Sequence, residues 1–165
     1  MKERKTMPFD KNFAPALRFA VMSDIHIDDE DCIEEQRLAK ALDDLKKMCS
    51  SDERYSGFDA LVIVGDFASR GSEIQMRKVK KILDAGLPAD VKLIMTMASH
   101  EYMTDGEENA LRRFDEIFGL TPDTHAVING FDFIAVTTTG GCHFDDKKRE
   151  FISAELEKAA ERDGK

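Results

Sequence analysis

Short apolar runs alternate along the chain with segments in which apolar residues recur every three or four positions. The short runs predict strands buried on both faces, and the periodic segments predict amphipathic helices. The expected strands are Leu17–Met22, Ala60–Val64 and Val91–Met97, and the expected helices are Ile33–Met48, Glu73–Ala85, Glu107–Phe118 and Lys148–Glu161. Strands and helices that alternate in this way predict an α/β fold with a mostly parallel sheet.

One β-hairpin is expected in the last third of the chain. The apolar runs Ala126–Ile128 and Phe131–Val136 flank Asn129-Gly130, and Asn-Gly suits the two positive φ angles of a type I′ turn. His125 is expected at a turn just before the hairpin. Residues 1–16 are polar and contain two prolines, so we expect a flexible arm ahead of the fold. The 165 residues together are expected to form a single domain.

Composition and charge narrow the class of protein. There are 24 Lys and Arg residues against 33 Asp and Glu residues, which gives a net charge of −9. An acidic surface repels phosphates, so general nucleic-acid binding is not expected, although a bound cation can reverse the field locally. No apolar run is long enough to cross a membrane. Three cysteines without a Cys-x-x-Cys pair, together with the lack of an export signal, favour a cytoplasmic location.

Carboxylate and imidazole side chains follow three of the expected strands. Asp24 and His26 stand two positions apart after the first strand, Asp66 follows a glycine after the second, and His100 and Glu101 follow the third. Each cluster alone is explained as readily by capping or by a structural hydrogen bond. Together they mean more, because the carboxyl ends of parallel strands meet at one edge of a sheet, where ligands collect. Nitrogen and carboxylate ligands in one site suit Mn, Fe or Zn better than Ca.

These motifs resemble those of the calcineurin-like metallophosphoesterases. Members of that family carry Asp-x-His, then Gly-Asp, then Gly-Asn-His-Asp/Glu at successive strand ends, and later a lone His and a Gly-His-x-His. Here Asp24–His26 and Gly65–Asp66 match the first two blocks, and Ala98–Glu101 matches the third in part. The resemblance extends from Arg18 to the C-terminus. It implies that the chain supplies the N-terminal half of the family's α/β-β/α sandwich, with a mostly parallel sheet, helices and one hairpin.

The resemblance also implies a chemistry and a set of roles. The substrate would be a small-molecule phosphomonoester or phosphodiester, clamped by two divalent ions (Mn, Fe or Zn) and attacked in line by a bridging hydroxide. Asp24 and His26 would hold the first metal, and Asp66 would bridge both. His100 would donate a proton to the leaving alkoxide, and Glu101 would orient His100.

Three departures from the family pattern leave a second interpretation open. Ala98-Ser99 replaces Gly-Asn, so a short hydroxyl stands where an amide ligand of the second metal is expected. Ser69 occupies a position at which many members carry Asp or Asn, and the two later histidine motifs are absent from the chain. The alternative is a truncated or degenerate homologue without catalytic activity, which serves as a metal-binding or protein-interaction module.

The apolar strands also predict that the sheet needs a further layer to cover it. Leu61–Val64 and Leu93–Met97 are apolar at consecutive positions, so both faces of the sheet need burial. The helices Ile33–Met48 and Glu73–Ala85 can cover one face, and the other would need the second sheet of the sandwich. We therefore expect either a homodimer through the bare face or a missing C-terminal half that covers it.

Overall fold

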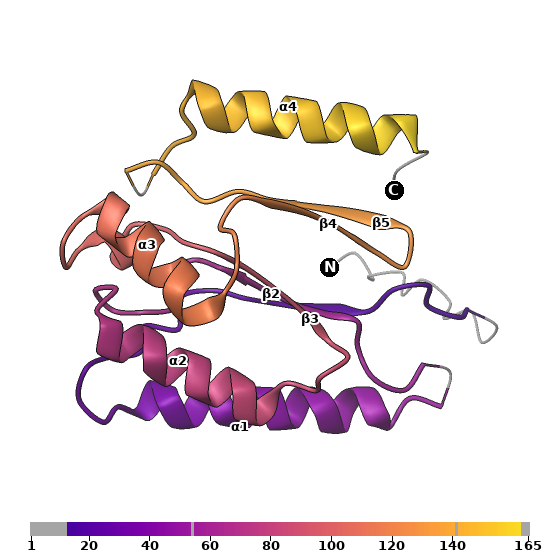
Figure 1. The fold of residues 1–165 in the computed structure, drawn as a ribbon. Coiled ribbons are helices and arrows are strands. Elements are labelled where there is room, and N and C mark those ends of the chain that lie inside the picture. The colour runs from indigo at the N-terminus through magenta and orange to yellow at the C-terminus, as the bar shows by residue number, and fades with distance from the viewer. Residues whose placement is uncertain (1–12, 54, 141, 163–165) are drawn as a thin grey trace, which may run out of the picture.

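A computed structural model describes residues 13–53, 55–140 and 142–162 of the chain. Its elements follow one another as β1 (Phe19–Met22), α1 (Ile33–Ser50), β2 (Ala60–Val64), α2 (Glu73–Gly86), β3 (Lys92–Thr96), η1 (His100–Tyr102), α3 (Glu107–Phe118), β4 (Thr124–Ile128), β5 (Phe131–Ala135) and α4 (Asp146–Glu161). The α/β fold is confirmed (Figure 1). Residues 1–12 of the expected N-terminal arm lie outside the described part. Among the described residues, no helix is both long and apolar enough to cross a membrane.

Three parallel strands form the central sheet in the order β1-β2-β3. The register pairs Phe19 with Ala60 and Ala60 with Lys92, so the strands begin nearly level. The helices α1 and α2, which connect these strands, lie side by side on one face of the sheet (Figure 1). Because all three strands run the same way, the loops at their carboxyl ends meet at one edge.

The main hydrophobic core lies between the sheet and these helices. Successive strand residues point to opposite faces, and the residues that face the helices include Leu61 and Ile63 of β2 and Met95 of β3. They pack in one cluster with Leu42 of α1 and Met76 of α2, and each of these side chains is at most 1% exposed. This burial anchors the strands whose ends carry the candidate site.

The hairpin covers part of the other face of the sheet. β4 and β5 pair antiparallel around Asn129 and Gly130, whose φ angles of 51° and 82° confirm the expected turn with two positive φ angles. Ala60 and Ile94 of the sheet pack with Ile128 of the hairpin in a second buried cluster. Helix α4 lies over the outer side of the hairpin, so the molecule is built in layers (Figure 1).

The expectation of a bare second face is therefore wrong in part. The chain itself supplies a two-stranded second sheet over this face. The cover stops short of one side, because Phe19, Val21 and Val64 remain 48%, 56% and 46% exposed. In-register parallel pairing places these three side chains on the same face. We refer to Phe19, Val21 and Val64 as the β1–β2 strip.

The contact between α4 and the hairpin centres on a histidine. His125 lies within β4 and not at the expected turn. Its Nδ1 is 2.6 Å from Glu155 Oε2 of α4, its Nε2 is 2.5 Å from Asp132 Oδ1 of β5, and the side chain is only 10% exposed. Lys158 donates to Glu155 at 2.6 Å, and Arg162 pairs with Asp132. We refer to these five residues as the α4 clamp.

Candidate metal centre

The candidate site is built by three loops at the carboxyl edge of the sheet. Asp24 and His26 follow β1, Asp66 follows β2, and His100 opens η1 after β3. The first two loops run side by side, since the His26 N–H donates to the Asp66 carbonyl at 3.1 Å. Ile27 then forms a parallel bridge with Ala68. The pairing of β1 with β2 thus resumes beyond the strand ends and fixes the two loops relative to each other.

Three residues of these loops have a left-handed backbone conformation. The φ angle is 53° at Asp24, 54° at His26 and 50° at Asp66, and among the described non-glycine residues only Asn129 of the hairpin turn shares the positive sign. Such a conformation costs about 1–3 kcal/mol and gathers at functional sites, where the surrounding structure maintains it. The three φ angles therefore mark this edge of the sheet as a candidate functional site.

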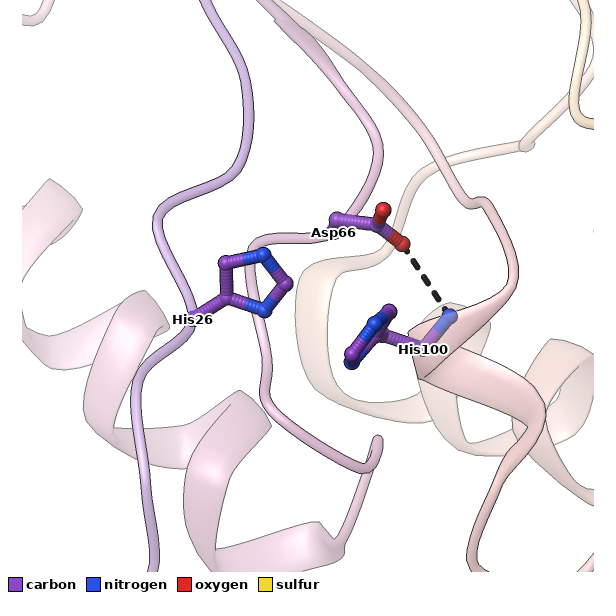
Figure 2. Close-up of side chains that lie close together, drawn as sticks. All are labelled: His26, Asp66 and His100. Atoms are coloured by element: carbon purple, nitrogen blue, oxygen red, sulfur yellow. Dashed lines mark hydrogen bonds between the residues drawn. The ribbon is translucent and has the colours of Figure 1, made fainter.

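His26, Asp66 and His100 converge on one point. Each offers a nitrogen or oxygen atom that lies within 4.8 Å of those of the other two. Figure 2 shows His26, from the loop after β1, facing Asp66 and His100. The centroids of the two imidazole rings are 4.5 Å apart, and the ring planes meet at 75°. Asp66 Oδ1 accepts a hydrogen bond from the backbone N–H of His100 at 3.0 Å.

A backbone carbonyl orients the ring of His100. The Nδ1 atom lies 2.8 Å from the carbonyl oxygen of Ser69. A carbonyl only accepts hydrogen bonds, so Nδ1 carries the proton, and the neutral ring keeps the lone pair of Nε2 for a metal ion or a proton. The resemblance implied that Glu101 orients His100, and this expectation is wrong. The Glu101 carboxylate instead accepts hydrogen bonds from three backbone N–H groups.

The order of these motifs and their convergence agree with the comparison against known protein families. The family model for calcineurin-like phosphoesterases matches residues 17–158. The chain belongs to the calcineurin-like phosphoesterase family. Membership supports the general enzyme class, a hydrolase of phosphoesters that depends on divalent metal. Among curated proteins, none matches this chain.

In this calcineurin-like phosphoesterase, Asp24 lies beside the converging residues and not among them. One of its carboxylate oxygens is 3.9 Å from His26 Nε2, and the side chain is 68% exposed. Asp24 and His26 line a cavity of about 540 Å³ that Arg37 also borders. The role of Asp24 as a metal ligand stays a prediction, as do the roles of His26, Asp66 and His100.

Two serines mark the positions at which this phosphoesterase departs from the family pattern. Ser69 Oγ donates to the His26 carbonyl at 2.9 Å, while the Ser69 carbonyl receives His100 Nδ1. Ser69 therefore links the two histidine loops. Ser99 is exposed, and its hydroxyl caps no helix. Sequence reasoning singled out Ser69 only as a substitution, because a contact made by a backbone carbonyl leaves no signal in the residue type.

Glu101 is a fully buried carboxylate behind the site. Its Oε2 accepts from the N–H groups of Asp66 and Ala98, both at 2.9 Å, and its Oε1 accepts from that of Ala68 at 3.0 Å. Burial raises the pKa of the Glu101 carboxyl above its usual range, and the three donated hydrogen bonds offset only part of this rise. The geometry is that of an ionised carboxylate, because a protonated carboxyl would turn an O–H group toward backbone donors.

The residues present fit one divalent cation. The His26 imidazole and the Asp66 carboxylate, with the Asp24 carboxylate beside them, form the mixed nitrogen and oxygen set that Zn, Mn and Fe accept. The His100 ring lies within reach of the same point and is oriented by the Ser69 carbonyl. Three protein ligands would leave a coordination position open for water or a phosphate oxygen.

Proposed function

We propose that this chain hydrolyses phosphomonoester or phosphodiester bonds of small molecules in the cytoplasm, with divalent Mn, Fe or Zn at the candidate site. The supporting observation is the convergence of His26, Asp66 and His100 from three strand ends in a calcineurin-like phosphoesterase. A divalent cation there would clamp the phosphate oxygens and lower the pKa of a bound water.

The side chains of this chain would hold the cation and move one proton. His26 and Asp66 would bind the cation, with Asp24 as the further ligand that the family pattern implies. Water adds to phosphorus, the ester P–O bond breaks, and the leaving alkoxide takes a proton from His100. Because Nδ1–H stays bonded to the Ser69 carbonyl, His100 donates this proton from Nε2 as an imidazolium.

The test is the activity of the purified chain toward p-nitrophenyl phosphate and bis-p-nitrophenyl phosphate, with added Mn, Zn or Fe(II). We expect hydrolysis that a chelator abolishes. His100→Ala should lower kcat by about 100-fold or more, because it removes the proton donor. His143→Ala is the matched control, since His143 is exposed and outside the converging group. Metal-independent turnover, or full activity in His100→Ala, would contradict the proposal.

Calorimetry should find one tightly bound Mn per chain. The ligands that the family pattern gives to the first metal, Asp24, His26 and Asp66, are present, whereas the amide ligand of the second metal is replaced by Ser99. Asp66→Ala should abolish the binding. Two tight sites per chain, or wild-type affinity in Asp66→Ala, would contradict this stoichiometry.

A metal-binding or protein-interaction module without catalysis is the second candidate. The exposed Ser99, at the position of the family's amide ligand, favours it. Tight Mn binding without turnover of either substrate would select this alternative over the hydrolase.

A further inference from the structure

The carboxylate of Glu101 has no part in the proposed reaction, yet it lies directly behind the site. The residue is 0% exposed. A buried charge is unfavourable unless hydrogen bonds satisfy it. Its carboxylate accepts hydrogen bonds from the backbone N–H groups of Asp66, Ala68 and Ala98, and all three belong to the loops that carry the site.

One oxygen of Glu101 joins two of these loops. Oε2 accepts from Asp66, in the loop after β2, and from Ala98, in the loop after β3, each at 2.9 Å. Hydrogen bonds to an ionised acceptor are roughly twice as strong as neutral ones. One of them is donated by Asp66, whose φ angle of 50° is unfavourable by itself.

We infer that Glu101 is a positioning residue, which holds the backbone of Asp66 in its left-handed conformation and so presents the Asp66 carboxylate to the divalent cation. The inference rests on the proposed function, because it takes Asp66 as a ligand of the cation. The Asp66 residue is fixed at two points, since its Oδ1 also accepts the N–H of His100 at 3.0 Å.

Close packing of glycines brings the Glu101 carboxylate within reach of both loops. A Cβ at Gly71 would lie 1.9 Å from the Glu101 carbonyl oxygen, so η1 sits directly on this glycine. A Cβ at Gly65 would lie 2.5 Å from the Cβ of Ala98. Two loops and η1 therefore meet at distances that only glycine allows at these positions.

Mn affinity of variants of the full chain tests the inference, measured by calorimetry well below the unfolding midpoint. Glu101→Met removes both acceptor oxygens at similar volume and should weaken Mn binding by about 10- to 100-fold, as is typical when a group that orients a metal ligand is lost. Glu101→Gln keeps one oxygen, which can still join Asp66 to Ala98, so its loss of affinity should be smaller. Leu83→Ala, a change on the buried face of α2, is the control. It lowers stability but should keep the wild-type affinity for Mn.

Three outcomes would overturn the inference. Wild-type affinity in Glu101→Met would show that Asp66 needs no such support. Equal losses in the Met and Gln variants would assign the effect to the lost charge and not to the hydrogen bonds. A loss in Leu83→Ala as large as that in Glu101→Met would assign it to general stability. Failure of the proposed function would give different results from failure of this inference. In that case the wild-type chain itself would bind no Mn, or Asp66→Ala would bind Mn as tightly as the wild type.

Discussion

At the scale of single residues, the site depends on backbone conformations that most side chains avoid. Gly65 precedes Asp66 at the end of β2, has a φ angle of +77°, and faces Ala98 of the next loop at very short range. Gly57 also has a positive φ angle, +103°, but a Cβ there would meet nothing within 4 Å. Substituting alanine at Gly65 and at Gly57 therefore separates the cost of the backbone conformation from the cost of close packing.

Gly65→Ala should therefore destabilise the protein by about 3 kcal/mol, from backbone strain together with overpacking against Ala98. Gly57→Ala should lose only about 1 kcal/mol, because the strain acts alone. Urea unfolding of the two variants and the wild type measures the difference. Equal losses would mean that the loops after β2 and β3 are less tightly packed than the structure shows.

Ser99→Asn tests whether the loop after β3 borders a second metal. An amide oxygen reaches further than a hydroxyl and is the ligand that the family pattern has at this position. Turnover at limiting Mn should rise, with a lower Mn concentration at half-maximal activity, whereas Ser153→Asn, an exposed change on α4, should leave both unchanged. An unaltered Mn dependence in Ser99→Asn would place Ser99 away from the second metal.

At the scale of elements, the α4 clamp should make the docking of α4 on the hairpin depend on pH. The two ring nitrogens of His125 lie 2.6 Å from Glu155 Oε2 and 2.5 Å from Asp132 Oδ1, and the Arg162 guanidinium also approaches Nε2, at 3.2 Å. Hydrogen bonding from His125 lowers the pKa of Asp132, and hydrogen bonding from Lys158, then from His125, lowers that of Glu155. These lowered carboxyl pKa values give stabilisation that is full above about pH 5 and lost as pH falls through the folded values.

Amide hydrogen exchange of α4, corrected for intrinsic rates and compared with α2, should therefore show full protection above about pH 5 and a loss of protection as pH falls below it. Asp132→Asn removes one of the two carboxylates whose pKa is lowered, so part of this acid loss of protection should disappear. Asp146→Asn makes the same change at an exposed position of α4 and should behave like the wild type. Protection of α4 that does not change with pH would rule out the clamp.

The elements also show how much of this fold and site the sequence could predict. The strand ends were predictable, because an apolar run that is followed by Asp24, Asp66 or His100 is visible in the sequence itself. The burial of Glu101 was not, since its partners are backbone N–H groups that any residue offers. His125 was misplaced because a polar residue at the start of a strand is indistinguishable from a turn residue until its carboxylate partners, far along the chain, are known.

At the scale of the whole molecule, the β1–β2 strip is exposed apolar surface that the hairpin covers only at one edge, where Phe19 packs edge-to-face against Phe133. We predict that the chain associates through it, because apolar patches of this kind on a sheet face mark interfaces. Light scattering should give about twice the mass of a single chain, and Val21→Lys should return a monomer. Val127→Lys is the matched control, since Val127 is 52% exposed on the hairpin and outside the strip. A monodisperse wild-type monomer would show that the strip is simply solvated.

The three loops of the site come from strands that are neighbours both along the chain and in the sheet, and this sets the moment at which the whole site can first form. His100 and the Glu101 carboxylate that fixes Asp66 both follow β3, so a nascent chain that has made only β1 and β2 presents its Asp and His side chains without a formed site. Docking of β3 is then the event that completes the centre. If a cation binds as proposed, full affinity for it should therefore appear only after both crossovers have closed, and the gain of Mn affinity would report when the last strand of the sheet docks.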